Sequence, residues 1–209
     1  MTLCGIDEAG RGPLAGPVTA AAVVLGPHFP RDILADSKAL SASQREAIAK
    51  TVVAGDACWA LGWVWPEEID TLNIHHAALE AMSRAFTSLR EKAILEQPVE
   101  VVVDGRFCPD LDDPVSGEAP SGECRSIAVR ALVGGDREVP EVMAASIVAK
   151  VWRDRWMQRY GEWDCRYGFA SHKGYPTAGH RRALSDHGAC PIHRRTFRGV
   201  LHADSVPSA

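Results

Sequence analysis

Acidic residues follow two apolar segments of the sequence at the point where each segment ends. Asp7 and Glu8 come directly after the apolar residues 3–6, and Asp104 follows the valine-rich residues 99–103. Carboxylates at the ends of buried strands are costly unless a cation or hydrogen-bond donors compensate them. If the two segments are neighbouring strands, their carboxylates meet at one edge of a sheet. The pattern predicts a cation site, and hard oxygen ligands favour Mg²⁺ or Mn²⁺ over zinc.

A fourth acid, Asp154, lies in a segment with helical periodicity. A helix is expected from Pro140 to about residue 160, and Asp154 continues its apolar stripe. An acid on a core-facing stripe needs a partner. Arg153 or Arg155 could pair with it; alternatively, it shares a metal with the strand-end acids, where two ions about 4 Å apart would bracket a phosphodiester. Spacing alone leaves both alternatives open.

A glycine-rich connection follows the first pair of acids. Gly10, Arg11 and Gly12 come just after Glu8, and the chain contains neither a Gly-x-x-x-x-Gly-Lys phosphate loop nor a Gly-x-Gly-x-x-Gly fingerprint. Glycine leaves the backbone bare, so that another molecule can approach it closely. This connection is therefore a candidate binding surface beside the carboxylates.

The elements that must position these residues alternate in part between strands and helices. We expect an α/β class, with a mixed sheet of about five strands flanked by helices and a helical C-terminal extension. The first two strands can pair antiparallel through the glycine-rich connection. Strands are expected at residues 3–6, 17–25, 58–64, 99–103 and 126–133, and helices at 41–53, 73–95, 140–160 and 177–187. Residues 66–68 fit a first helical turn that begins with Pro66.

The length of 209 residues predicts one domain, residues 1–201. Its helical C-terminal segment is expected to be the substrate-binding part because of the charge described below. Residues 107–125 are rich in Pro, Gly, Ser and acids and are expected to form a surface loop insertion; residues 202–209 are expected to be a flexible tail. No apolar run approaches the roughly 18 residues that span a bilayer, and no signal-like segment begins the chain, which predicts a cytoplasmic protein.

The charge of the chain is unevenly distributed. Residues 150–198 contain 11 basic and 4 acidic side chains, a net charge of +7, whereas the whole chain carries -4. A basic C-terminal quarter on an acidic body favours local phosphate binding, although a solvated helical face gives the same pattern.

Seven segments, in order along the whole chain, resemble the motifs of ribonuclease HII. The first of them is specific by itself. The resemblance implies a ribonuclease H-like fold and a metal-dependent endonuclease that uses Mg²⁺ or Mn²⁺. The segments are residues 5–17, 36–38, 103–105, 135–136, 144–150 with 153–155, 172–177 and 193–197.

The resemblance also implies the substrate and the products. The enzyme would hydrolyse the RNA strand of RNA–DNA hybrids and cut on the 5′ side of single ribonucleotides embedded in duplex DNA, an activity of ribonucleotide excision repair. It would leave 3′-hydroxyl and 5′-phosphate ends. Its partners would be these nucleic acids and no membrane, and we expect a monomer.

By position, the resemblance assigns metal binding and catalysis to Asp7, Glu8, Asp104 and Asp154. Two departures accompany them, neither of which removes an acid. Arg106 stands where an asparagine is common, and a tryptophan, Trp152, stands where a small threonine is usual.

The substrate-binding residues are assigned in the same way. Gly10, Arg11 and Gly12 resemble the loop that senses the ribose 2′-hydroxyl, the group that distinguishes RNA from DNA. Tyr175 resembles the tyrosine that packs on the deoxyribose 3′ of the ribonucleotide. Two lysines are expected to contact phosphates, Lys38 and Lys173.

Structural roles are expected for several other polar and aromatic residues. Asp136 follows a glycine in a turn and is interpreted as a backbone cap. The pair Arg194 and Arg195 is left open between a phosphate contact and the cover of a helix end. Packing is favoured over proton transfer for His172, His180 and His193, and over base stacking for Trp59, Trp63 and Trp65.

Two alternatives to the nuclease belong to different classes. One is a hybrid-binding protein with weak or lost catalysis, against which the presence of all four acids speaks. The other is a different polynucleotidyl transferase on the same fold, such as a resolvase, which would act on branched DNA without a ribose.

Overall fold

The computed structural model of the chain describes residues 1–93, 95, 99–111 and 127–200. The expected insertion at 107–125 is described only as far as residue 111, and the expected tail at 202–209 lies outside the described residues. In chain order, the elements are β1 (Thr2–Ala9), β2 (Val18–Leu25), η1 (Arg31–Ile33), α1 (Ala42–Ala54), β3 (Ala57–Val64), α2 (Pro66–Lys92), β4 (Val99–Asp104), β5 (Ile127–Leu132), α3 (Gly135–Glu138), α4 (Pro140–Trp163), η2 (Cys165–Tyr167), α5 (Phe169–His172) and α6 (Ala178–His187).

The five strands form one mixed sheet in the order β3-β2-β1-β4-β5. β1 pairs antiparallel with β2 and parallel with β4, and β5 continues the parallel half of the sheet. β3 pairs antiparallel with β2, although α1 separates them in sequence. The predicted α/β class and the five-stranded mixed sheet are confirmed, including the antiparallel pairing of the first two strands.

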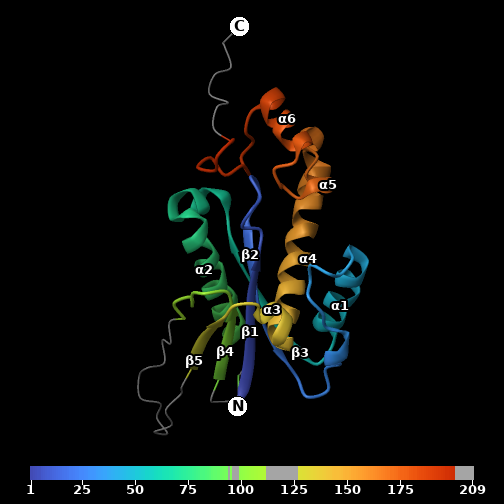
Figure 1. Cartoon of the computed structure of the whole chain (residues 1–209), viewed down its shortest axis with the longest axis vertical. Helices are drawn as coiled ribbons and strands as arrows, with labels where there is room; N and C mark the ends of the chain where they lie inside the picture. The colour runs from blue at the N-terminus through green and yellow to red at the C-terminus, as the bar shows by residue number, and fades with distance from the viewer. Residues whose placement is uncertain (94, 96–98, 112–126, 201–209) are drawn as a thin grey trace.

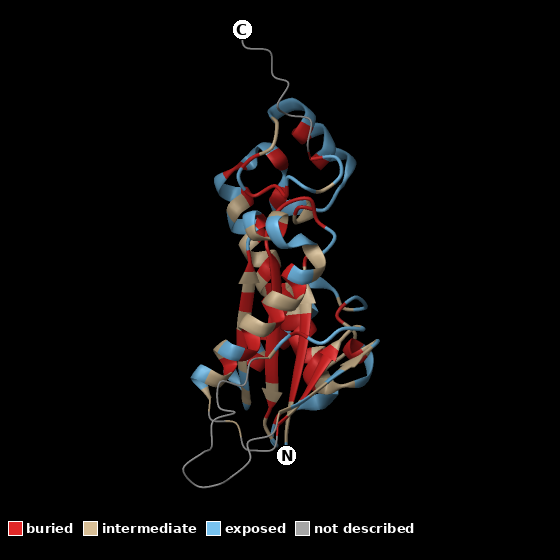
Figure 2. Ribbon diagram, turned by 90° about the vertical axis from the view of Figure 1, so that its left-hand side faces the viewer, coloured by how far each residue is buried: buried red, intermediate tan, exposed pale blue. Residues whose placement is uncertain are grey.

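Both faces of the sheet are buried, and β2 shows how one strand serves two cores. Val18, Ala20 and Ala22 pack in a cluster with α2, whereas the intervening Ala21 and Val23 pack in a second cluster with α1 and α4. This alternation is the two-residue period of a strand. Figure 1 shows α2 on one side of the sheet and α4 with α1 on the other. The central strands β1, β2 and β4 are mostly buried between them, whereas the edge strands β3 and β5 are only partly buried (Figure 2).

The helical turn expected at residues 66–68 and the helix expected from residue 73 are two segments of one helix, and α4 is a few residues longer than expected. α2 begins at Pro66, and its helical geometry is interrupted at Asn73, which has a φ of 64° and whose side chain accepts hydrogen bonds from the amides of His75 and His76. The predicted helix start at residue 73 is therefore the beginning of its second segment. α4 continues to Trp163. Among the described residues, no helix is long and apolar enough to cross a membrane.

Two of the three tryptophans at residues 59–65, Trp59 and Trp65, contact side chains of α4, as expected. Trp59 stacks on Trp152 of α4 with ring centroids 5.9 Å apart, and both rings belong to the core between the sheet and α4. Trp63 stacks on Trp65, which in turn contacts Trp156 of α4. The unusual tryptophan at position 152 thus has a packing partner on the edge strand.

The C-terminal extension has its own small core at one end of the sheet (Figure 1). His193 and His180 are buried inside it with their Nε2 atoms 3.0 Å apart. The amide of Cys190 donates to Nδ1 of His193, so the proton of a neutral His193 lies on Nε2 and is donated to His180. His180 then donates from Nδ1 to the carbonyl of Tyr175 at 2.9 Å. This chain of hydrogen bonds requires neutral rings, so His180 and His193 are packed inside this core as neutral side chains.

The hydrogen bonds between these buried histidines predict a loss of protein stability in mild acid. Burial, followed by the charge of His180, lowers the pKa of His193 from 6.5 to about 4. Above pH 6.5 the neutral His193 leaves the free energy of unfolding unchanged with pH, because neither the folded nor the unfolded state binds a proton there. As the pH falls from 6.5 towards 4, the unfolded state binds a proton that the folded state does not, so the free energy of unfolding decreases. The loss is about 3 kcal/mol at most. Urea unfolding at a series of pH values measures it.

A matched pair of variants separates this effect from other titrations. His193→Gln should remove the difference in unfolding free energy between pH 6.5 and pH 4 that the buried ring causes. His28→Gln, which changes an exposed histidine outside the extension, should keep it. An unaltered pH dependence in His193→Gln would contradict the assignment.

Candidate active site

The acids of β1 and β4 meet where the two strands separate. Parallel pairing of β1 with β4 ends at Ile6 and Val103, whereas antiparallel pairing of β1 with β2 continues to Ala9. The next residues on the two strands, Asp7 and Asp104, lie side by side at the start of this opening. The predicted meeting of the two strand-end carboxylates is therefore seen in the structure.

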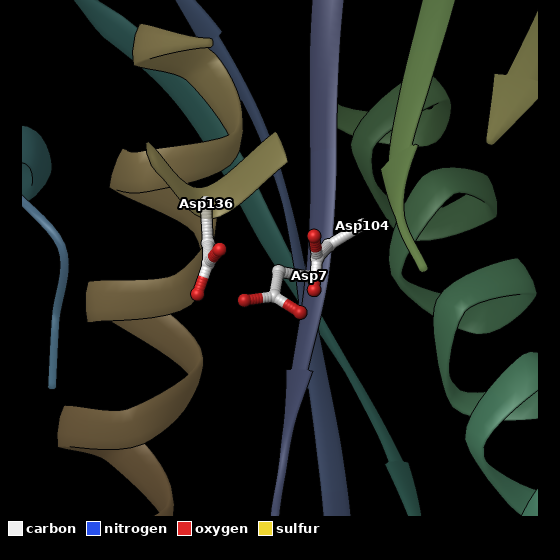
Figure 3. Close-up of side chains that lie close together, drawn as sticks. All are labelled: Asp7, Asp104 and Asp136. Atoms are coloured by element: carbon white, nitrogen blue, oxygen red, sulfur yellow. The ribbon is translucent and has the colours of Figure 1, made fainter. Parts of the chain in front are cut away.

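A third carboxylate joins them from the segment after β5. Gly134 adopts a φ of 80°, and this left-handed turn leads into α3, which carries Asp136. Oxygens of Asp7, Asp104 and Asp136 all lie within 4.8 Å of one another, and in Figure 3 the three side chains point towards a common centre. Asp136 does not act as the backbone cap that the sequence suggested; its buried carboxylate accepts a 2.8 Å hydrogen bond from Lys38.

The electrostatics of this group favour a cation. Burial raises the pKa of Asp7 well above its usual value, and the charges of Glu8 and Asp104 raise it further, whereas a hydrogen bond from Ser146 acts against them. Oδ1 of Asp104 is buried without a hydrogen-bond partner among the described residues. An unpartnered carboxylate oxygen inside a set of hard oxygen donors fits a divalent ion such as Mg²⁺ or Mn²⁺.

Glu8 lies beside this group. Successive strand residues point to opposite faces, and Ile6 and Glu8 share the phase opposite to that of Asp7. Even so, Asp7 and Glu8 both line one cleft of about 310 Å³, because β1 is free of β4 beyond Ile6. Oε1 of Glu8 accepts a hydrogen bond of 3.2 Å from Arg11.

The glycine loop and Tyr175 line the same cleft. Gly10, Arg11 and Gly12 form one wall, and the ring of Tyr175 lies near Gly12, with Lys150 of α4 5.5 Å from its centre. The structure therefore brings the predicted ribose-sensing loop, the predicted sugar-packing tyrosine and the carboxylates to one place.

The two glycines of the loop have different physical reasons to be glycine. Gly10 has a φ of 98°, and a Cβ atom there would lie 2.1 Å from Nε of the buried Arg153. The protein interior itself therefore requires glycine at position 10. At Gly12 a Cβ would meet nothing closer than Tyr175 at 3.7 Å. The bare backbone at Gly12 is unused by the fold and is open to an approaching molecule.

The two predicted phosphate-binding lysines lie in different places. Lys38 lines the cleft, where its ammonium group pairs with Asp136, and this hydrogen bond raises the pKa of Lys38. Lys173 is not among the residues that line the cleft. Its ammonium group donates to the carbonyl of Ala170, and its own carbonyl accepts from Arg153 at 3.1 Å.

Asp154 is not part of the carboxylate group that the described residues form. Ser146 of α4 is the residue that hydrogen-bonds Asp7, and Asp154 follows it by eight residues, which is about 12 Å farther along a helix axis. Its partner is Lys150 at 2.9 Å, and Arg153 lies 4.0 Å away. Arg155, the other expected partner, binds Glu46.

Sequence reasoning missed two kinds of residue at this site. Ser37 and Ser146 are buried with their hydroxyl oxygens 2.9 Å apart, so the polar loop before α1 reaches Asp7 through a serine of α4. Arg153 and Arg194 are completely buried beneath the glycine loop. Neither phosphate binding nor helix capping, the two roles left open for Arg194, is what its guanidinium does. Both kinds lie in segments that resemble family motifs, which was the available signal.

Comparisons of the sequence with known proteins all point to one family. The sequence model of ribonuclease HII matches residues 4–200. The ribonuclease HII of Paracidovorax citrulli is 49% identical over 201 residues, which are 96% of this chain and 76% of that protein. The ribonuclease HII of a Polaromonas species is 48% identical over 198 residues, 95% of this chain and 90% of that protein.

Solved structures agree with the sequence comparison. The ribonuclease H2 of Pyrococcus horikoshii has a TM-score of 0.69 at 26% identity, covering 96% of this chain and 95% of that one. The Archaeoglobus fulgidus enzyme, solved in a PCNA:RNase HII complex, has a TM-score of 0.65 at 29% identity, covering 89% and 88%. The chain belongs to the ribonuclease HII family, whose members are metal-dependent endonucleases that hydrolyse the RNA of RNA–DNA hybrids.

Proposed function

We propose that this ribonuclease HII, besides hydrolysing the RNA strand of hybrids, cuts on the 5′ side of single ribonucleotides embedded in duplex DNA and leaves 3′-hydroxyl and 5′-phosphate ends. The supporting observation is the composition of one cleft. The carboxylates of Asp7, Glu8 and Asp104 line it together with a glycine loop, which has an open face at Gly12, and with Tyr175. If the site recognises one ribose directly beside the carboxylates, a single ribonucleotide is sufficient for cleavage, and a stretch of several ribonucleotides is not required.

The metal ligands that we propose are Asp7, Asp104 and Asp136, with Glu8 beside them. Their mutual approach and the unpartnered oxygen of Asp104 support this set. A divalent ion bound there supplies Lewis-acid polarisation of the phosphodiester and lowers the pKa of a water nucleophile. The contribution of the chain is to hold these oxygens in place, with Ser146 fixing Asp7 and Lys38 fixing Asp136.

Asp154 keeps a place in the proposal beside the metal ligands, not among them. It orients Lys150, whose ammonium group lies over the ring of Tyr175. The predicted catalytic role of Asp154 therefore becomes a positioning role at the cleft wall.

Substrate contacts follow from the lining of the cleft. The backbone of residues 10–12 would meet the ribose, and the ring of Tyr175, which is 39% exposed, would pack on the following deoxyribose. Lys38 would contact a phosphate, and Lys173 would do so from outside the cleft. We also propose, as the sequence suggests, a monomer located in the cytoplasm that acts in ribonucleotide excision repair.

Cleavage of a duplex with one embedded ribonucleotide tests this function. With Mg²⁺ or Mn²⁺, the protein should cut this duplex on the 5′ side of the ribonucleotide and leave an all-DNA duplex and branched DNA intact. Asp104→Asn should lower kcat by about a thousandfold, because several kcal/mol of charge stabilisation in the transition state are lost, while binding persists. Denaturing gel electrophoresis measures the products. A folded protein that cuts only branched DNA would instead be a resolvase.

The choice between Asp136 and Asp154 as a metal ligand can be tested directly. Asp136→Asn should lower kcat by about a hundredfold or more, because it removes a charged oxygen ligand. Asp154→Asn should stay within about tenfold of the unaltered protein. Calorimetric titration with Mn²⁺ adds a second readout, in which Asp136→Asn alone should weaken binding. The reverse order of effects would restore Asp154 as the ligand.

The glycine loop offers a third comparison. Gly12→Ala should fold normally but lower kcat/KM for the embedded ribonucleotide by about a hundredfold, because the added methyl group occupies the space of the approaching sugar. Gly10→Ala should lower the free energy of unfolding by roughly 2–4 kcal/mol, since its φ and the contact with Arg153 both become unfavourable. Urea unfolding and cleavage kinetics separate the two effects. Full activity of Gly12→Ala would contradict the proposed role of the loop.

A further inference from the structure

Two arginine side chains lie completely buried beneath the glycine loop, and they come from distant parts of the chain. Arg153 is on α4, and Arg194 follows α6. Arg194 donates to the carbonyl oxygens of four residues between positions 10 and 16, and Arg153 donates to those of two residues at positions 15 and 17. The distances from Arg194 are 2.6 Å to Gly10, 3.1 Å to Arg11, 2.8 Å to Pro13 and 2.9 Å to Gly16, and those from Arg153 are 3.1 Å to Ala15 and 2.8 Å to Pro17.

Burying two guanidinium groups to support a loop is destabilising compared with an apolar support. The described residues provide Arg194 with carbonyl groups and not with a carboxylate. Burial, followed by the charge of Arg153, lowers the pKa of Arg194 to about 9. A buried charge that lacks an ionic partner costs several kcal/mol, and well-packed apolar side chains would fill the same space at a lower cost. Loop stability alone therefore does not account for two guanidinium groups here.

The geometry of the peptide bond gives the arrangement a use. In a trans peptide the carbonyl and the following N–H point in opposite directions. Since the carbonyls of Gly10 and Arg11 point inward to Arg194, the N–H groups of Arg11 and Gly12 point away from it. Within the described part of the chain, these two amides have no protein acceptor, and both residues line the cleft.

We propose that Arg194, together with Arg153, is a positioning residue for ribonucleotide recognition: it fixes the peptides of residues 10–12 so that the amides of Arg11 and Gly12 face the substrate sugar. The inference rests on the proposed function of the loop. Arginine suits the task because its rigid fork holds several carbonyls at once, whereas the ammonium group of lysine is a single point.

The test measures preference for a ribose in the absence of turnover. In an Asp104→Asn background, fluorescence anisotropy compares the Kd of a duplex with one ribonucleotide to that of the same duplex made entirely of DNA. Arg194→Lys, which keeps the charge, should reduce the preference for the ribonucleotide by about tenfold, the equivalent of one or two hydrogen bonds. Binding of the all-DNA duplex should not change. The matched control is Arg155→Lys, whose guanidinium binds Glu46 away from the loop.

The outcomes distinguish a failure of the proposed loop function from a failure of the positioning role of Arg194. If the background protein with Arg194 intact shows no preference for the ribose, the proposed function of the loop fails. If the preference is present and a folded Arg194→Lys retains it, the positioning role is overturned. A preference lowered equally by Arg155→Lys also overturns it, because a general loss of charge geometry would then be the cause.

A milder variant serves if Arg194→Lys does not fold. Asp70 of α2 accepts hydrogen bonds from the amides of Arg195 and Thr196 at 2.8 and 2.9 Å, so it anchors the segment that carries Arg194. Asp70→Asn weakens that anchor without touching the buried core. It should lower the preference for the ribose in the same direction, by severalfold, and an unchanged preference in this variant overturns the proposal.

Discussion

Repulsion among buried carboxylates is the constraint on which the rest of this structure depends. Asp7, Asp104 and Asp136 converge within 4.8 Å, and two of them, Asp7 and Asp136, are buried. No strand could carry such a group in the middle of a paired sheet, where its oxygens would lack compensation. The group exists because β1 leaves β4 after Ile6, and because a serine and a lysine from outside the sheet approach its edge. The opening of the sheet and the cluster of charges therefore depend on each other.

α4 fixes the distance between the carboxylate group and the glycine loop with Tyr175. Ser146 in the first half of the helix holds Asp7, Lys150 lies over Tyr175 one turn later, and Arg153 lies beneath the glycine loop. The apolar side of the same helix packs in the core against the sheet. Because one rigid helix bears all three contacts, a movement of the loop relative to the carboxylates would require the helix to leave the sheet.

The sequence was sufficient for the fold and for part of the site. Apolar runs identified all five strands and the principal helices, and the acids at the ends of two runs led to Asp7 and Asp104. Asp136, which the structure places in the carboxylate group, was interpreted as a cap because a Gly-Asp pair in a short turn has no periodicity. Asp154 was chosen from its position in the family resemblance and from helical periodicity, which predicts the face of a residue but not its height along the helix relative to a sheet edge. The reason for Gly10 was also hidden, since it depends on an arginine 143 positions later in the chain.

The contact between Arg194 and the glycine loop has a consequence for the folding of the enzyme. The hydrogen bond from Arg194 to Gly10 joins residues separated by 184 positions in the sequence. The glycine loop is therefore held by a contact of very large sequence separation. Closing so long a loop is entropically unfavourable until the intervening elements are in place. Loop-closure entropy therefore favours an order of folding in which the sheet and its carboxylates assemble before the glycine loop acquires its final conformation, since that conformation needs the docked C-terminal extension. If the loop recognises the ribose as proposed, nascent and C-terminally shortened chains would bear the acids without their selectivity for substrate.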